Sequence, residues 1–361
     1  MKFEMTSAPW ADLGVLYTTK SEEGEQASQV GLIMEQSRFG REYVGCVGVG
    51  AVSTKPQFRR EGLVRKSLET FFEEAKEHPE WAVSLLHPFS FPYYRKFGYE
   101  KVSYHQTMEM PIQALDMFPR FANFVPVTPE LEPALLALYD RFAQGRNMPF
   151  KRTNMKWFPK NPQNQLYVRM KDGVATAYIS FRVEDHLLVN RMVGDRLVID
   201  EYGFDSPEAL QEILGFIRMF DGQMLRVKFT DTFLCPEVDM MLRHYHSIEY
   251  VRYPDISAKI LNLKAMLEAN DYPQKGGRFV LGTAAGEKWL VEYEAGQACV
   301  KPACCEADLV CDEPALARVL YGLDPLTAGN IRYMPGVDVR GNVEDLLRAF
   351  PTRICGMFEH F

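Results

Sequence analysis

The stretch that decides the fold is Val47–Ser67, VGVGAVSTKPQFRREGLVRKS. Its first half has the small and β-branched residues of a buried strand. A proline then ends the strand, and a short loop leads into a helix that starts at Gly62. Amides in the first turn of a helix are unpaired and carry roughly half a positive charge, and Arg59 and Arg60 stand beside them. The stretch therefore predicts an anion site suited to a pyrophosphate. A plain strand-to-helix turn with solvated arginines is the alternative.

The glycines of this stretch argue against two other nucleotide sites. Gly45, Gly48 and Gly50 lie inside the strand instead of opening a helix, and they do not form G-x-G-x-x-G, so a Rossmann dinucleotide site is excluded. The sequence also contains no G-K-[ST] of a P-loop.

The flanking sequence predicts a mixed unit of strands and helices. The stretches VGLIME (30–35) and YVGCVGVGAVST (43–54) are typical of strands, and a turn at Phe39-Gly40 lies between them. The 3.6-residue apolar spacing over 64–75 indicates an amphipathic helix, which the His78-Pro79 pair ends. A strand over Trp81–Leu86, a loop and a further extended stretch over 101–110 complete this unit.

Two more units follow along the chain. Helical spacing over 131–142 is succeeded by a hairpin with its turn at Asp172-Gly173 and by extended stretches over 187–193 and 196–202. Ser206 then begins a helix that runs to about residue 220. This order resembles the first unit and suggests a degenerate duplication. The last unit opens near Pro254 with a helical pattern, ILNLKAMLEAN, followed by strands in FVLGT, KWLVEY and ACVKP and by two helices.

Composition agrees with a folded chain of several domains. The 361 residues correspond to about two or three domains, and 47% hydrophobic with 25% charged residues is typical of a globular protein. The net charge of -7 disfavours nucleic acid and anionic membranes as partners and favours cationic ligands. We find no apolar run long enough for a membrane span and no signal peptide at the start, so we expect a cytoplasmic protein.

Cysteines and histidines give no metal site. The seven cysteines are odd in number, and those at 299, 304, 305 and 311 lack C-x2-C spacing and a nearby histidine. We expect reduced thiols and, for these four, small buried side chains. His244 and His246 have ligand-like spacing, but no carboxylate or cysteine stands in register with them, so we assign no metal.

The run from Pro56 to Val64, P-x-x-R-R-x-G-L-V, resembles the acetyl-CoA signature of GNAT-superfamily N-acetyltransferases, R-x-x-G-x-G/A. Val64 replaces the usual small residue, a departure shared with the enhanced intracellular survival (Eis) acetyltransferases. A second motif, Tyr94-Arg95-Lys96-Phe97-Gly98-Tyr99, resembles the Eis-like Y-x-R/K-F-G-Y just past the fifth strand.

The resemblance implies an α/β (α+β) chain of two fused GNAT acyltransferase domains with mixed sheets, followed by a smaller α+β domain. We expect a GNAT domain with the acetyl-CoA site over residues 1–120, a second, degenerate GNAT domain over 121–254, and a sterol-carrier-protein-like domain over 255–361. The family also implies a homo-oligomer, namely a hexamer. The segment before residue 47 is short for the usual opening strand and helices, so we expect short or rebuilt substrate-binding helices.

The resemblance also implies roles for individual residues. Acetyl-CoA would bind to the strand backbone at Val52 and Thr54, and to the loop and helix start formed by Arg59, Arg60, Gly62, Leu63 and Val64. Tyr94 matches the family's general acid, although a packed aromatic is the alternative reading for this residue alone.

The terminal carboxylate of Phe361 matches the family's general base. A free α-carboxylate, with a pKa of about 3.5, is a weak base toward an amine, but its charge concentrates a cationic substrate beside it. His360 and Glu359 remain rival bases, and His87 lies close to the expected site.

These inferences combine into one functional hypothesis. We expect an acetyl-CoA-dependent N-acetyltransferase that acts on primary amines of a cationic acceptor such as an aminoglycoside, a polyamine or a lysine side chain. The alternative is a non-catalytic acyl-CoA sensor or a binder of an apolar ligand.

Overall fold

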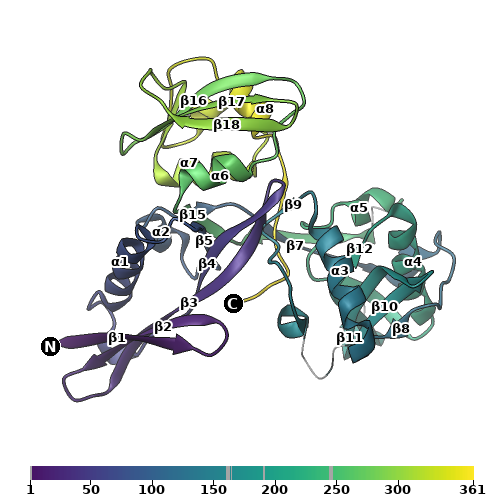
Figure 1. Cartoon of the computed structure of the whole chain (residues 1–361). Coiled ribbons are helices and arrows are strands. Elements are labelled where there is room, and N and C mark those ends of the chain that lie inside the picture. Colours follow the sequence, from purple (N-terminus) through teal and green to yellow (C-terminus); the bar gives the residue numbers. More distant parts are fainter. Residues whose placement is uncertain (1, 160–162, 164, 190–191, 244–246) are drawn as a thin grey trace. The chain divides into compact units, whose positions relative to one another are not determined.

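The computed structural model describes residues 2–159, 163, 165–189, 192–243 and 247–361. The chain forms two compact units (Figure 1). The first unit comprises residues 1–103 and 255–355 together with the last two residues, and the second comprises 104–254 and 356–359. His244 and His246 lie outside the described residues.

A seven-stranded mixed sheet forms the core of the first unit. Its strands, in spatial order, are β1 (Phe3–Trp10), β2 (Gly14–Ser21), β3 (Gln26–Phe39), β4 (Glu42–Thr54), β5 (Trp81–Leu86), β15 (Ser257–Ile260) and β6 (Glu100–Lys101). The first four strands form antiparallel neighbours, whereas β4 and β5 run parallel. The predicted strands in β3, β4 and β5 are confirmed.

Two helices from the N-terminal part of the chain accompany this sheet. The amphipathic helix α1 (Leu63–Ala75) packs on β3 and β4, and α2 (Phe91–Arg95) is a short helix after β5. A short 3-10 turn, η1 (Pro56–Phe58), connects β4 to α1. Leu68 and Phe71, in the apolar stripe of α1, are completely buried in the core of this sheet. Burial of two such side chains contributes roughly 3 to 6 kcal/mol of hydrophobic free energy.

Two features of this sheet differ from the expectation. The chain before β3 forms a long β1–β2 hairpin, and residues 3–39, all of them described, contain no helix. The patterns of β1 and β2 are only half-buried, so they lack the clean alternation that identifies a strand. Ile260, the first residue of the predicted helical pattern, is instead the last residue of strand β15 (Ser257–Ile260), which pairs with β5 and β6.

The remainder of the first unit is an α+β layer on a five-stranded sheet. The strands, in spatial order, are β18 (Gln297–Pro302), β17 (Lys288–Glu294), β16 (Gly277–Thr283), β19 (Leu309–Cys311) and β20 (Val337–Val339). The helices of this part are α6 (Leu263–Ala269), α7 (Glu313–Tyr321) and α8 (Glu344–Ala349), and a short strand β21 (Ile354–Cys355) follows. The predicted helices and strands after residue 262 are confirmed.

The second unit is built on another seven-stranded mixed sheet. Its strands, in spatial order, are β14 (Glu249–Pro254), β7 (Tyr104–Pro111), β13 (Met224–Phe229), β12 (Met192–Phe204), β11 (Val174–Val189), β10 (Gln165–Lys171) and β8 (Val125–Pro126). It also contains α3 (Glu132–Ala143), β9 (Arg146–Asn147), α4 (Pro207–Ile217) and α5 (Glu237–Met241). Both α3 and α4 pack on β11 and β12.

Two strands belong to a different sheet from the one that the predicted domain limits imply. Strand β7, placed by the sequence within 1–120, pairs with β13 and β14 in the second sheet. Strand β15, placed within 255–361, belongs to the first sheet. The extended stretch predicted over 196–202 lies within β12. The one predicted over 187–193 covers the end of β11 and the start of β12, and its residues 190 and 191 lie outside the described residues. The three-domain division itself remains a prediction.

The chain has no membrane-spanning helix among its described residues, since none of those helices is both long and apolar enough.

Candidate functional site

The site begins where β4 and β5 part. Their parallel pairing ends at Gly48 and Leu85, but β4 continues to Thr54 with β3 as its only described partner. Ala51 has a positive φ of 49° at a register shift between β3 and β4, which is a β-bulge that bends β4 locally. One edge of β4 beyond Gly48 therefore offers backbone amide and carbonyl groups to an extended ligand. The two residues predicted to bind through their backbone, Val52 and Thr54, lie in this part and are half-buried.

The predicted anion loop lies directly after β4. Arg60 and Gly62 both have left-handed backbone conformations, with φ of 70° and 75°. No side chain caps α1, and its first turn contains no acidic residue, so the amides at its start have neither a capping acceptor nor a competing charge there. Arg59 and Arg60 are exposed beside this turn. The space around Gly62 is open, since a Cβ placed there would meet nothing within 4 Å. These features fit a phosphate group.

Leu63 and Val64 contribute to this loop through their backbone. The Leu63 side chain is buried with Phe58 and Ala27, and Val64 packs against the core of the first sheet. Their side chains anchor the start of α1, which leaves the amides as the only groups able to meet a ligand.

Tyr94 lies in α2 and is 2% exposed. Its ring packs edge-on against Phe89 and Tyr93, with centroids 5.2 Å away in both cases. It belongs to the same apolar cluster as Val49 of β4 and Leu86 of β5. Burial, helped by the neighbouring Tyr93, raises the pKa of Tyr94 above its usual value of about 10. The phenol is thus held in its neutral, proton-donating form.

The last residue of the chain lies on β4. A Cβ on Gly50 would stand 3.0 Å from the carboxyl carbon of Phe361, and a Cβ on Gly48 would stand 2.8 Å from Cε2 of its ring. The two glycines therefore make room for the chain end. The Phe361 ring also meets the imidazole of His87 edge-on at 5.4 Å between centroids. The predicted base is thus brought onto the strand that carries Val52 and Thr54.

A histidine–aspartate pair adjoins the chain end. His87 directly follows β5, and its Nδ1 lies 3.0 Å from Oδ1 of Asp255, which stands just before β15. The pair forms because Ser257 of β15 is in register with Leu86 of β5. Sequence reasoning noticed His87 but missed Asp255, because no local pattern indicates that residues so far apart in the chain pair.

The two rival bases have different surroundings. His360 is exposed, and its ring lies 5.3 Å from that of His87. Glu359 is 1% exposed, and its carboxylate accepts hydrogen bonds from Arg152 and Tyr139 within the second unit. Its carboxylate is thus already engaged by two donors.

The second sheet lacks the features of the anion loop. Ser206 Oγ caps α4 by accepting a hydrogen bond from the Ala209 amide at 3.2 Å, and Glu208 puts a negative charge in the first turn. Both features disfavour a phosphate at that helix start.

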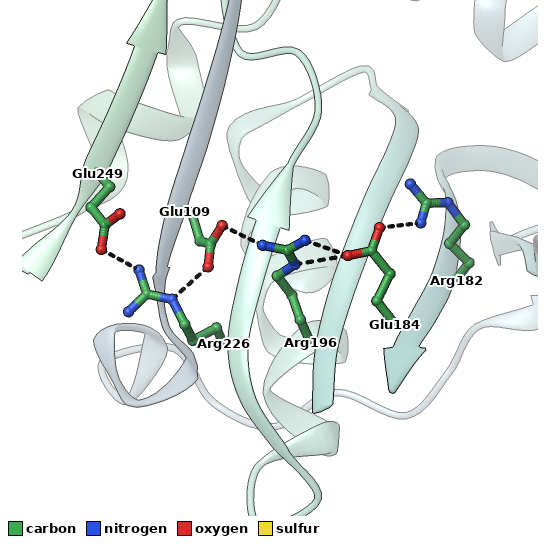
Figure 2. A network of polar contacts seen from close by, with 6 residues as sticks. All are labelled: Glu109, Arg182, Glu184, Arg196, Arg226 and Glu249. Carbon is green, nitrogen blue, oxygen red and sulfur yellow. Dashed lines mark hydrogen bonds and ion pairs between the residues drawn. The ribbon is translucent and has the colours of Figure 1, made fainter. Parts of the chain in front are cut away.

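The arginines drawn in Figure 2 are paired with carboxylates as well. They form an alternating ladder over the second sheet, made of Glu249, Arg226, Glu109, Arg196, Glu184 and Arg182. Because each of these guanidinium groups already contacts a carboxylate, the ladder holds no cation ready for an anionic ligand.

The cysteine expectation needs one correction. Cys299, Cys304 and Cys305 are exposed instead of buried, because they lie on the edge strand β18 and in the loop after it, whereas Cys311 is buried in β19. All seven cysteines are free thiols. The described residues contain no group of three or more histidine, cysteine or acidic side chains that could hold a metal ion.

Comparison with known proteins supports the fold of the site. Residues 16–102 match the model of the acetyltransferase (GNAT) domain. No curated protein matches the chain. Among solved structures, a GCN5-related N-acetyltransferase from Anabaena variabilis has a TM-score of 0.81 at 20% identity, over 96% of this chain and 89% of that one.

Two further structures are similar over nearly their whole length. Eis1 from Mycobacterium abscessus has a TM-score of 0.77 at 14% identity, over 96% of this chain and 90% of that one. A probable N-acyltransferase of unknown function from Enterococcus faecalis has a TM-score of 0.77 at 16% identity, over 100% of both chains. The chain thus contains a GNAT acetyltransferase domain within a mixed α/β fold shared with these proteins.

Proposed function

We propose that the chain is an acetyl-CoA-dependent N-acetyltransferase that acts on the primary amine of a cationic acceptor, such as an aminoglycoside, a polyamine or a lysine side chain. The observation that carries the proposal is the position of the chain end. The terminal carboxyl group lies over Gly50, on the strand whose free edge leads into an uncapped helix start flanked by two arginines.

The residues present fit acetyl-CoA as the co-substrate. The free edge of β4 at Val52 and Thr54 suits the amide groups of a pantetheine arm. The amides of Leu63 and Val64, together with Arg59, suit its pyrophosphate. The thioester would supply an activated acetyl group. The base and the acid of the reaction are then residues of the chain itself.

The Phe361 carboxylate acts as the base. It attracts the acceptor's ammonium group and takes one proton from it, which passes to water and leaves a neutral amine. The nitrogen lone pair then forms the C–N bond as the C–S bond breaks, and the carboxylate takes the second proton of the nitrogen. The net charge of -7 supports a cationic acceptor.

Tyr94 acts as the acid. It gives its proton to the sulfur that leaves and regains one from solvent, so the cycle releases one free proton for each amide formed. Its raised pKa keeps it protonated until the sulfur departs.

Thiol release from acetyl-CoA tests the proposal, with a panel of aminoglycosides, polyamines and lysine peptides as acceptors. We expect release with at least one class of amine, and loss of turnover but unchanged acetyl-CoA affinity when Phe361 is deleted. Binding of acetyl-CoA in a calorimeter without thiol release from any amine would instead favour a non-catalytic sensor.

A further inference from the structure

Trp10 is the last residue of β1, and its indole lies over the neighbouring part of β3. A Cβ on Gly31 would stand 2.3 Å from Cζ3 of this ring and 2.9 Å from its Cε3 and Cη2. The indole can lie this close to the strand only because position 31 has no side chain. Trp10 is half-buried, so part of its ring remains accessible to solvent.

The indole and the chain end lie on the same face of the first sheet. Gly31 of β3 and Gly50 of β4 are register partners, and a Cβ on Gly50 would stand 3.0 Å from the carboxyl carbon of Phe361. Directly paired residues of antiparallel strands point to the same face, and the next residue along each strand points to the opposite face. Those next residues, Leu32 and Val49, share a core cluster with the buried side of α1. Trp10 and Phe361 therefore both lie on the face that α1 does not cover.

The two groups are close enough to contact one small ligand. Cβ positions of directly paired residues are about 4.5 to 5.5 Å apart, so the indole and the carboxyl group are separated by at most about 11 Å. A cation contacts an aromatic ring within about 6 Å of its centroid, and an ammonium group donates to a carboxylate at about 3 Å. One alkylammonium group and its hydrocarbon can span that separation.

An indole beside a carboxylate recognises a particular kind of amine. The face of the indole attracts a cation, and tryptophan does so better than the other aromatic residues. The carboxylate of Phe361 adds a full negative charge and accepts the N–H groups. The large apolar surface of the ring also gains free energy from covering CH2 groups, which a hydroxylated substrate lacks beside its amine.

We propose that Trp10 is a specificity-determining residue of the acceptor site, where its indole binds the ammonium group of an alkyl amine and the hydrocarbon next to it. The amine then belongs to an unbranched alkyl chain, as in a polyamine or a lysine side chain. The β1–β2 hairpin, present where the sequence predicted short or rebuilt helices, supplies this residue. This inference rests on the proposed function, because the bound amine is the acceptor of the acetyl group.

Calorimetric titration of the full chain, saturated with CoA, tests recognition of the cation apart from any chemistry. The probe is hexamethylenediamine, and the diol of the same length is its uncharged match. We expect the diol to bind at least about 10-fold more weakly than the diamine. Trp10→Leu should weaken diamine binding about 5- to 30-fold, whereas Trp10→Phe keeps an aromatic face and should retain most of the affinity.

Thiol release with spermidine and with a lysine peptide tests the same contact during turnover. In Trp10→Leu, kcat/KM should fall about 5- to 30-fold, mainly through KM, because the lost contact holds the amine in the ground state and in the transition state alike. Gly31→Ala pushes the indole away from β3 and should raise KM as well. The acceptor whose KM responds shows whether the amine is a free polyamine or a lysine side chain.

Trp289→Leu is the matched control, since Trp289 is a half-buried tryptophan of β17 in the other sheet of the same unit. It should leave diamine affinity and KM unchanged. Equal affinity for diamine and diol, no measurable diamine binding, or a folded Trp10→Leu variant with unchanged diamine affinity and KM would each overturn the proposal.

The two assays also separate this proposal from the proposed function. If the diamine binds through Trp10 but no amine releases thiol, acetyl transfer is wrong and the cation site stands. If amines release thiol while Trp10→Leu leaves KM and diamine affinity unchanged, only the role of Trp10 is wrong.

Discussion

Replacing Gly50 by alanine tests whether the chain end is part of the reacting centre. The new Cβ would stand 3.0 Å from the carboxyl carbon of Phe361, whereas carbon atoms in contact prefer about 3.5 to 4.0 Å. The chain end must therefore retreat by roughly 0.5 to 1 Å, because Ile33 Cδ1, 3.4 Å from the same Cβ, leaves the Cβ little room to move away.

A displacement of this size is large for a catalytic group. Misplacement by about 1 Å costs on the order of 100-fold in rate, so we expect kcat/KM for the amine to fall about 10- to 100-fold, or about 1.4 to 2.7 kcal/mol. Acetyl-CoA affinity, measured by calorimetry, should not change. Gly50 itself has no positive φ, so alanine should leave stability within about 1 kcal/mol of its original value.

Gly329→Ala is the control for the general effect of a lost glycine. Gly329 is exposed, also without a positive φ, and its Cβ would meet only Thr327 Oγ1 at 3.7 Å. Gly48→Ala provides a second displacement, since its Cβ would stand 2.8 Å from the Phe361 ring. If Gly50→Ala and Gly48→Ala fold normally and turn over every acceptor at the original rate, the chain end plays no part in the chemistry.

Four further predictions concern the acid and the cofactor site. Tyr94→Phe should lower kcat by about 100-fold or more while acetyl-CoA affinity is kept, and equal turnover would exclude this acid. Because burial raises the pKa of Tyr94, its proton remains available at high pH, so a pH–rate profile should show no fall from loss of this acid between about pH 8 and 10. Arg59→Ala should weaken acetyl-CoA binding about 10-fold or more, measured by calorimetry, with little effect on kcat at saturation. Titration should give one acetyl-CoA per chain, since Ser206 and Glu208 disfavour an anion at α4, and a stoichiometry of two would contradict this.

The parts of the fold that the sequence predicts well depend on neighbours along the chain. The strand Trp81–Leu86 and the helix α1 have strong apolar patterns, and Ser206 acts as the predicted N-cap. The turn between β4 and α1 is local in the same sense, because its proline, arginines and Gly62 follow one another in the chain, and its anion-binding role remains a prediction. Such features depend on residues close together in the chain, so the local sequence pattern predicts them.

Contacts between residues far apart in the chain could not be predicted from the sequence. The pairing of β15 with β5 brings Asp255 to His87, and no periodicity near either residue indicates it. Arg152 likewise gives no signal that it will hold Glu359, since an arginine in a polar loop is usually solvated. These contacts depend on which strands become neighbours in a sheet, and many pairings are compatible with the same local patterns.

The glycines of β4 exclude a dinucleotide motif, and they also carry a second signal. Glycine weakens the interior of a strand and often marks a place where another backbone comes close. Gly48 and Gly50 lie under the ring and the carboxyl group of Phe361, and a Cβ on Gly45 would stand 2.0 Å from the carbonyl oxygen of Glu80. The glycines at 45, 48 and 50, which do not form a dinucleotide motif, are therefore explained by the close approach of other parts of the chain. A strand with repeated glycines beside an anion loop should accordingly be examined for a chain segment, here the terminus itself, that passes directly over it.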